Sequence, residues 1–375
     1  MLKQVMLRML AVAEASGLSR SLSASAWRRR RLLILCYHGV SKYGEHEWAN
    51  YYIAADTFRR RMQILKDFGC NVLPLSEALT RLHDGTLPER AVAITFDDGF
   101  HDYYSVAFPI LEEFGFPATL YLTTYYVEFN RPVFDPMCSY LLWKARQRGD
   151  AGQPERSGGN PEKPQRGDAG LEWPEVLGAP VTLDDAGRRG AVAAIKQFAL
   201  QRKLSGREKD DLLARLADRL GLDYQDLCRK RVLHLITPEE ATELASRGAD
   251  LQYHTHRHRV YRSRERMFAE LEDNRRRIVS YTSKEPRHYC YTGSFYLPQH
   301  PGYLREYGIQ SATTLDRGLC TAHTDPLLLP RIGDGMALSD LEFRAWLAGT
   351  AEFLPRRRIK MSEGQLTEEE EPAAA

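Results

Sequence analysis

Two clusters of carboxylate and imidazole side chains each follow a predicted strand directly. Asp97 and Asp98 come after the apolar run AVAITF, and His254 and His258 come after a second strand. Adjacent side chains on an extended backbone point in opposite directions, so one carboxylate can bind a metal ion while its neighbour acts as a base. Imidazoles four residues apart can reach one ion across a helical turn. Two imidazoles and one carboxylate leave coordination positions open, which is typical of a catalytic metal site.

Each cluster also has a plainer interpretation. Asp-Gly is a common turn pair, so Asp98 and Gly99 alone predict a turn as readily as a site. His256, between the other two histidines, fits a polar loop best. Three histidines within five residues are nevertheless rare in a chain with 11 among 375 residues, which favours His254 and His258 as ligands.

Further candidate groups lie near the ends of other predicted strands. Gly293, with Tyr291 and Thr292 before it, would let a backbone amide approach a ligand and stabilise an oxyanion, although a simple turn explains these residues equally well. His38 ends the first strand, and His323 lies in a loop. For both histidines a structural role is the alternative to proton transfer.

Apolar strands and helices alternate along much of the chain. This alternation predicts parallel βαβ units and an α/β fold. The predicted strands are 32–37, 71–74, 91–96, 118–123, 249–253, 288–291, 311–315 and 327–332, and the helices between them include 55–68, 75–82, 105–114, 267–280 and one capped by Thr237 and ended by Gly248.

Composition excludes several classes of protein. Hydrophobic residues make up 43% and charged residues 27% of the chain, as in an ordinary globular protein and unlike a disordered or fibrous one. Basic residues outnumber acidic ones by 52 to 50, so overall charge gives no support for a nucleic-acid partner. The six cysteines are scattered without a Cys-x-x-Cys pair, which favours reduced thiols over a disulfide framework or a zinc-cysteine site.

The pattern predicts one barrel with additions. Residues 1–31 are an N-terminal amphipathic helix and basic linker, residues 32–352 the barrel, and residues 353–375 a disordered acidic tail. An insertion at about 130–235 interrupts the barrel, partly disordered around the repeated RGDAG string and partly helical. Within it Ser205 and Glu208 make a capping box, but nothing indicates catalysis.

The N-terminal segment has two interpretations. Its apolar residues recur at helical spacing and precede the basic run Arg28–Arg31. The helix either packs on the barrel exterior, which we favour, or makes a peripheral contact with an anionic membrane face. The apolar stretch is too short for a convincing signal peptide and no run could span a membrane, so we expect a cytoplasmic protein, with any membrane contact at the inner face.

The motifs and their order resemble the NodB-type polysaccharide deacetylases. The resemblance covers roughly residues 32–128 and 234–347 and excludes the insertion and both termini. Its two leading motifs are TFDDG and H-T-x-x-H, each after a strand. Similar segments are LILCYHGV, FDDGFHDYYSVAFPILEEFGFPATLYL, ITPEEATELASRGADLQYHTHRH, YCYTGS and TDPLLLPRIG.

The resemblance implies a deformed (β/α) barrel of fewer than eight strands with the site at the carboxyl ends of the strands. It implies that Asp97 is the general base and that Asp98, His254 and His258 bind a divalent metal ion, with Zn²⁺ expected. A backbone amide among Tyr291, Thr292 and Gly293 would donate a hydrogen bond to the oxyanion.

The chain departs from the family pattern in two places. Cys290 stands where the family's third motif has an arginine that orients the base, and we hypothesise that Arg331 supplies this cation from a neighbouring strand. The family's closing Leu-x-Leu-His motif, which carries the acid histidine, is not evident. Either His38 or His323 would then protonate the leaving amine, and we favour His38.

The expected reaction is hydrolysis of an acetyl amide on an amino sugar, with an acetylated amino-sugar glycan or glycolipid precursor as substrate. The aromatic residues Tyr103, Tyr104, Phe295 and Tyr296 could stack on a sugar or simply pack. Three alternatives stay open: a hydrolase of the same fold acting on a non-sugar amide, an O-acetyl esterase, and an inactive glycan-binding barrel.

Overall fold

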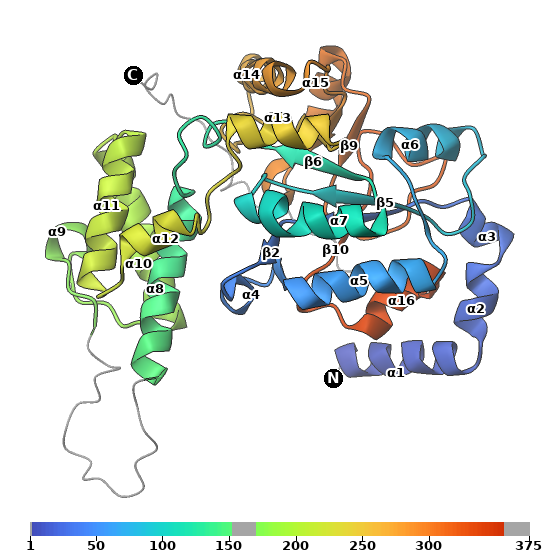
Figure 1. Cartoon of the computed structure of the whole chain (residues 1–375), viewed down its shortest axis with the longest axis horizontal. Helices are drawn as coiled ribbons and strands as arrows, with labels where there is room; N and C mark the ends of the chain where they lie inside the picture. Colours follow the sequence, from blue (N-terminus) through green and yellow to red (C-terminus); the bar gives the residue numbers. More distant parts are fainter. Residues whose placement is uncertain (1, 152–169, 356–375) are drawn as a thin grey trace, which may run out of the picture. The chain divides into compact units, whose positions relative to one another are not determined.

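The computed structural model describes residues 2–151 and 170–355 and divides into two compact units (Figure 1). One unit runs to Phe129 and resumes at Ile236, and the other spans Asn130–Leu235. Most of the repeat-containing loop and of the predicted acidic tail lies outside the described residues. Among the described residues, no helix is long and apolar enough to cross a membrane.

The first unit is built on a parallel sheet. Its strands are β1 (Leu33–Tyr37), β4 (Asn71–Val72), β5 (Ala91–Phe96), β6 (Ala118–Leu122), β7 (Asp250–Tyr253), β8 (His288–Cys290), β9 (Ser311–Thr313) and β10 (Ile332–Gly333). They follow the order β10-β1-β5-β6-β7-β8-β9, with β4 paired to the start of β5. The predicted α/β barrel is thereby confirmed. Seven strands form the path and the short β4 is an eighth in the described sheet, beyond the expected count.

The segment that leads into β10 joins the two ends of the sheet. Leu329 forms a parallel bridge with Thr313 of β9, and Ile332 pairs with Leu35 of β1. The predicted strand 327–332 is therefore wrong in extent, because only Ile332–Gly333 is a strand. Pro330 lacks an N–H group and interrupts the ladder between the two pairings.

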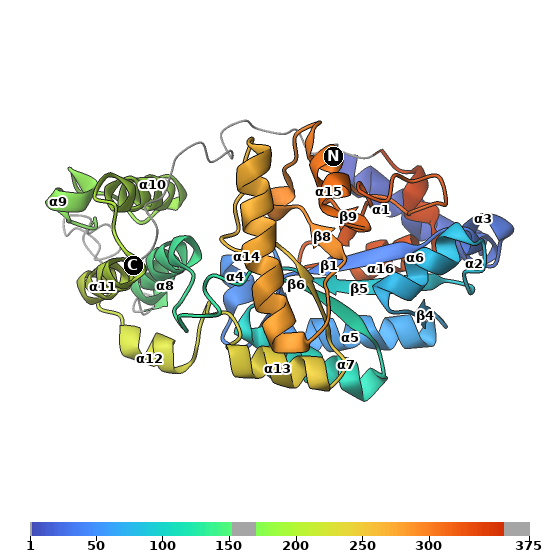
Figure 2. The same ribbon diagram turned by 90° about the horizontal axis from the view of Figure 1, so that it is seen from above.

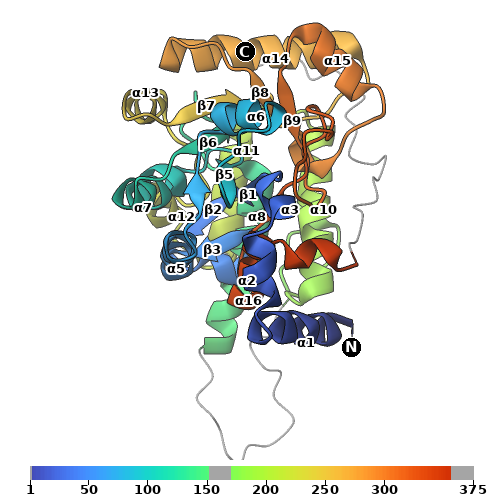
Figure 3. The same ribbon diagram turned by 90° about the vertical axis from the view of Figure 1, so that its right-hand side faces the viewer.

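Helices cover the outer side of the curled sheet. Figure 3 shows α5, α7 and α13 along one side, and Figure 2 shows α14, which packs against β7. Their bounds are α5 (Ala55–Asp67), α6 (Leu75–His83), α7 (Phe108–Phe114), α13 (Pro238–Ser246), α14 (Arg264–Thr282), α15 (His300–Tyr307) and α16 (Asp340–Ala348). The predicted helix 105–114 begins instead as a π-helical turn, Tyr103–Ala107.

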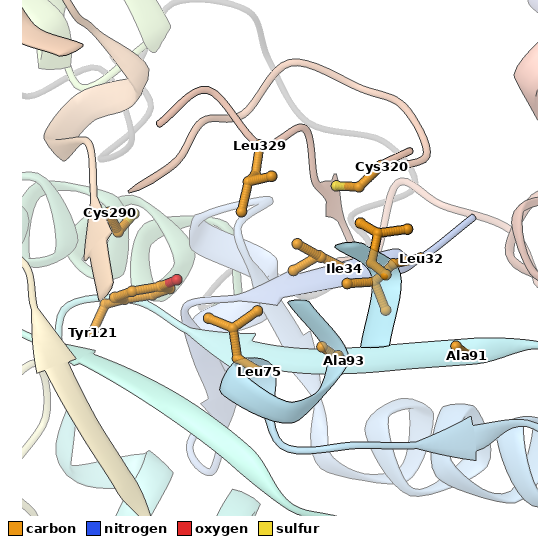
Figure 4. Close-up of a cluster of buried hydrophobic side chains, with 11 residues drawn as sticks. Leu32, Ile34, Leu75, Ala91, Ala93, Tyr121, Cys290, Cys320 and Leu329 are labelled. Atoms are coloured by element: carbon orange, nitrogen blue, oxygen red, sulfur yellow. The ribbon is translucent and has the colours of Figure 1, made fainter. Parts of the chain in front are cut away.

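The inner face of the sheet is filled by an apolar cluster (Figure 4). Leu32 and Ile34 are fully buried there beside Leu75 of α6, together with Cys320 and Leu329. Burial of such side chains stabilises the fold by about 1.5–3 kcal/mol each. The cluster includes Cys290, so the packed core extends to the strand end that carries the candidate site.

A small two-stranded sheet follows β1. Its strands β2 (Gly39–Ser41) and β3 (Tyr52–Ala54) are parallel, and α4 (Glu45–Trp48) connects them. The sequence analysis did not predict these elements. Strands of three residues are too short to show a period.

The N-terminal residues form α1 (Leu2–Ala15), α2 (Leu18–Ser23) and α3 (Ala26–Arg29). Helix α1 packs against α16 and buries Leu10, in keeping with the favoured packing interpretation. The basic run is not a uniform surface patch. Arg28 is fully buried, and its guanidinium donates to the carbonyl oxygens of Leu347 at 2.8 Å and Arg31 at 2.6 Å.

The second unit is helical in its described part. Its helices are α8 (Phe134–Ala151), α9 (Pro174–Leu177), α10 (Asp185–Gln201), α11 (Gly206–Arg219) and α12 (Tyr224–Arg229). Ser205 and Glu208 form the capping box that the sequence indicates. Leu212, Leu213 and Leu216 are the buried face of α11.

Candidate active site

Candidate residues from distant parts of the chain meet at the carboxyl ends of the parallel strands. Asp97 and Asp98 follow β5, His38 follows β1, and His254 follows β7. In a parallel sheet these ends lie at one edge, where the connecting loops can present polar groups without interrupting the ladder. The fold therefore collects residues that lie up to 220 positions apart, from His38 to His258.

Asp98, His254 and His258 form a compact group. The Oδ1 atom of Asp98 lies 3.1 Å from Nε2 of His254 and 3.2 Å from Nε2 of His258. The ligand atoms all lie within 4.8 Å of one another. Asp98 and His258 both have positive φ, at 72° and 55°, a conformation that costs energy and is common at functional sites.

Gly99 allows the turn that presents Asp98. Its φ is +90°, and a Cβ atom at this position would clash with the side chain of Leu122. The Asp-Gly pair is thus both a turn and part of the site, so the two interpretations of this motif describe the same structure.

Hydrogen bonds fix the orientation of His254. Its Nδ1 lies 3.0 Å from the carbonyl oxygen of Cys290, so donation of the Nδ1 proton leaves Nε2 as a free ligand atom. Its backbone N–H donates to the side-chain oxygen of Asn274, whose amide nitrogen donates to Leu122 and Thr124. Asn274 was missed by sequence reasoning, because one buried asparagine within a charged helix has no distinguishing pattern.

His256 is not placed with the ligands. Its Nδ1 lies 2.9 Å from the hydroxyl of Thr124. Burial, together with the charge of Arg257, lowers the pKa of His256 to about 4, so the ring is neutral near pH 7. This is the structural role expected for the middle histidine.

Asp97 is held by a buried arginine. Arg331 is fully buried and donates from Nη1 to Oδ1 at 2.7 Å and from Nη2 to Oδ2 at 2.8 Å. Burial alone would raise the pKa of Asp97, but the charge and hydrogen bonds of Arg331 outweigh this effect and hold the pKa well below its usual value. The structure thus brings together the two residues that the sequence analysis pairs.

Two thiols complete the surroundings of Asp97. The Sγ atoms of Cys290 and Cys36 lie 3.4 and 3.5 Å from Oδ2, and Nη2 of Arg331 lies 3.0 Å from Sγ of Cys290. Burial raises the pKa of both thiols well above the ordinary value, so each remains protonated and can donate to the carboxylate. Sequence reasoning gave these cysteines no role.

His38 faces the same carboxylate, whereas His323 does not. Nε2 of His38 is 3.8 Å from Oδ2 of Asp97, and its side chain is 24% exposed, so solvent or a ligand can reach it. His323 is exposed in a turn, where its backbone N–H donates to the hydroxyl of Thr321. Among the described contacts, none joins His323 to Asp97 or to the candidate ligands.

Not all of the backbone amides predicted to stabilise an oxyanion are available to a ligand. The backbone N–H of Tyr291 donates to the carbonyl oxygen of Thr313 at 3.2 Å, so it cannot serve a ligand. Thr292 and Gly293 follow in a 3₁₀ turn, Thr292–Ser294, in which Gly293 has a φ of 61°. The hydroxyl of Thr292 is buried and has no hydrogen-bond partner among the described residues.

The aromatic residues suggested for sugar stacking are mostly engaged elsewhere. Tyr103 and Phe295 are 0% and 1% exposed, so neither can stack on a ligand. Tyr104 donates its hydroxyl proton to Glu243, and Tyr296 packs 5.0 Å from Tyr291. The sequence around Tyr103 and Phe295 gives no sign that their rings are buried in the core.

The donor chemistry fits a divalent ion at Asp98. Two further sets of potential ligands, Cys36–His38–Asp97 and Asp97–His254–Cys290, both use Asp97. Arg331 already neutralises that carboxylate. Asp98, His254 and His258 provide two imidazole nitrogens and one carboxylate, the combination that zinc and similar ions accept with positions left open.

Comparison with known proteins agrees with this arrangement. The model of the family described as polysaccharide deacetylase matches residues 84–147 and 204–312. A poly-beta-1,6-N-acetyl-D-glucosamine N-deacetylase of Staphylococcus epidermidis is 31% identical over 112 residues. That alignment covers 27% of this chain and 39% of the relative, so the chain spans about two fifths of the curated relative's length.

Solved structures share the fold at low sequence identity. The deacetylase PplD of Streptococcus pyogenes, in complex with acetate, is 17% identical, with a TM-score of 0.53 over 87% of this chain and 99% of that one. IcaB from Ammonifex degensii is 16% identical, with a TM-score of 0.52 over 85% and 97% of the two chains. These solved structures show a shared fold, and together with the family model and the curated relatives they indicate a NodB-type polysaccharide deacetylase.

Proposed function

We propose that this protein is a metal-dependent hydrolase that removes N-acetyl groups from amino sugars of a polysaccharide or glycan precursor and releases acetate. One observation carries the proposal: Asp97, kept ionised by Arg331, lies directly beside the group of Asp98, His254 and His258. A base and a metal-ligand set side by side are what hydrolysis of an unactivated amide requires.

In this mechanism the metal ligands and the base have separate roles. Asp98, His254 and His258 would hold the ion, with zinc the expected metal. A divalent ion at this site would polarise the acetyl carbonyl and increase the acidity of water. Asp97 accepts a proton from the attacking water molecule, while Arg331 fixes the direction of its two oxygens.

The oxyanion and the leaving group need separate donors. Backbone amides of Thr292 and Gly293 would donate to the carbonyl oxygen as negative charge develops on it. His38, exposed beside Asp97, would then protonate the departing nitrogen. The products are acetate and a free amino sugar.

Three alternatives share parts of this site. An O-acetyl esterase would need the same base and ion, and a hydrolase of a non-sugar amide would differ in the groups around them. A glycan-binding barrel without activity would have no need for a buried base beside a set of metal ligands. The preserved group of Asp97, Asp98, His254 and His258 therefore favours an enzyme.

The function is tested by acetate release from β-1,6-linked N-acetylglucosamine oligomers. The purified protein should release acetate and equal amounts of free amine, lose this activity with a chelator, and regain it with Zn²⁺. Asp97→Asn should keep its metal content but lose activity by about 10²–10⁴-fold, because the base is removed.

The outcomes separate the alternatives. Ammonia without acetate would indicate a different amide, and acetate from esters alone would indicate an esterase. Oligomer binding without turnover, unaltered in Asp97→Asn, would contradict the proposal and support a binding module.

Replacement of Arg331 should change the pH profile. A base acts only when it is ionised, so activity falls as pH drops through its pKa. Without the guanidinium, burial raises the pKa of Asp97, and the acid limb of kcat/KM should move to higher pH in both Arg331→Lys and Arg331→Ala, more strongly in the latter.

Arg331→Ala should also be less stable, by about 3–5 kcal/mol, because it leaves a buried charge without its partner. Arg331→Lys keeps a positive charge and serves as the folded comparison, checked by thermal unfolding. An acid limb at the same pH in all three proteins would refute the assigned role of Arg331.

The two candidate acids can be distinguished by paired substitutions. His38→Ala should lower kcat by about 10²–10⁴-fold at constant metal content, because the leaving nitrogen loses its proton donor. His323→Ala is the matched control and should retain wild-type turnover. The reverse result would assign the acid to His323.

We further propose that α1, although it packs against α16, uses its exposed face for a peripheral contact with an anionic membrane face, next to a glycan precursor on the cytoplasmic side. Val5, Met9 and Val12 recur at helical spacing and are 48%, 57% and 67% exposed, with Lys3 and Arg8 exposed on the same helix. Apolar and basic groups together on a surface helix favour binding to anionic lipid.

Sedimentation with phosphatidylglycerol vesicles checks this contact. The wild-type protein should co-sediment with them, and the double variant Val5→Gln, Met9→Gln should bind several-fold less without loss of activity on a soluble oligomer. Equal sedimentation of both proteins, or none by either, would contradict the proposal.

A further inference from the structure

A row of aromatic rings adjoins the candidate acid. The ring of Tyr51 lies 5.7 Å from that of His38, and the ring of Trp48 lies 5.8 Å from that of Tyr51, measured between centroids. His38 itself is 3.8 Å from Asp97. Trp48 and Tyr51 both belong to the segment that joins β2 and β3.

The rings of this row are accessible yet supported. Tyr51 and Trp48 are each half-buried. Behind them Tyr52 is fully buried and Phe100 nearly so, with the Tyr52 ring 6.3 Å from Trp48 and 5.8 Å from Phe100. The row therefore rests on the core and leaves part of its aromatic surface open.

The segment that carries the row is held in one conformation. The buried carboxylate of Glu45 accepts hydrogen bonds from the Ser41 hydroxyl at 2.9 Å and from the backbone N–H groups of Lys42 at 3.0 Å and Tyr43 at 2.8 Å. A preorganised surface loses little entropy when a ligand binds. Figure 1 shows this segment at α4, beside β2.

The contact between the two short strands also depends on close packing. The ring of Tyr52 lies directly against Gly39, where a Cβ atom would overlap it. The N–H of Val40 donates to Asp102 at 3.0 Å. The start of the segment is thus held by Asp102, and its end packs against Gly39 of β2.

The chemistry of such a surface suits a carbohydrate. Aromatic rings bind the apolar C–H faces of a sugar, while the polar end of Tyr51 can reach its hydroxyl groups. Tyr51 remains a donor, because burial and then the charges of Asp98 and Asp102 raise the pKa of its hydroxyl above the usual value. Tyr51 adjoins the reacting centre, and Trp48 lies one ring beyond it.

We infer that Tyr51 and Trp48 form a subsite for the sugar next to the one that loses its acetyl group. This inference rests on the proposed function. It assigns the recognition of a neighbouring sugar to Trp48, whose ring lies beside that of Tyr51.

The test compares N-acetylglucosamine with its β-1,6-linked pentamer as substrates. In the wild-type protein kcat/KM should be much higher for the pentamer. Trp48→Ala should raise KM for the pentamer on the order of fivefold to tenfold, the size expected for loss of one aromatic contact, with little change in kcat. The monomer should be hydrolysed as before, and Trp48→Phe should recover most of the pentamer affinity.

A binding measurement separates this inference from the proposed function. Calorimetric titration with the deacetylated pentamer, which cannot turn over, should show weaker binding to Trp48→Ala than to the wild type. Phe353→Ala is the control, because this ring is 66% exposed and stacks on Trp27 instead of belonging to the row. It should bind the deacetylated pentamer like the wild type.

Two results would overturn the subsite. One is equal loss of kcat/KM for monomer and pentamer in Trp48→Ala, and the other is unchanged pentamer binding in that variant. If the wild-type protein releases no acetate from either sugar, the proposed function fails, and the titration still decides whether the row binds the chain.

Discussion

The buried pair of Asp97 and Arg331 links the architecture of the barrel to its chemistry. Asp97 is at the end of β5, and Arg331 lies immediately before β10, in the segment that joins the two ends of the sheet. A carboxylate as buried as Asp97 would favour its neutral form without a partner, and a buried guanidinium without a partner would destabilise the fold. The same two-point contact therefore supports both closure of the barrel and ionisation of the base.

This arrangement explains how the chain departs from the family's third motif without losing the cation. The small side chain of Cys290 leaves space at the end of β8, and the guanidinium of Arg331 lies there, 3.0 Å from its Sγ. Arg331 is further fixed by the carbonyl of Thr314 and the hydroxyl of Thr95. Arg331 thus supplies a cation beside Asp97 from another part of the sequence, which is possible because β1 and the strands around it converge on one interior.

The fold and part of the site could be predicted from the sequence because their signals are local. A buried parallel strand is a continuous apolar run, and Asp97, Asp98, His254 and His258 stand directly after such elements. Pairings between distant segments give no such signal. Asn274, Cys36 and the row of Trp48 and Tyr51 act through contacts made only in the folded chain. The same holds for Tyr291. Its backbone N–H donates to the carbonyl oxygen of Thr313, and no local sequence pattern predicts this hydrogen bond.

The two adjacent carboxylates have different partners, and this difference suits two roles. The pKa of each lies below its usual value, although burial opposes this in both. For Asp97 the opposing charge is a guanidinium that neither dissociates nor gives up its proton, so the carboxylate is available only as a proton acceptor. For Asp98 the partners are the imidazoles of His254 and His258, whose ring nitrogens can share an ion with it. The turn at these residues thus places Asp97, which is paired permanently with Arg331, next to Asp98, which can bind an exchangeable ion. A water molecule between the two carboxylates would have a base on one side and an ion on the other.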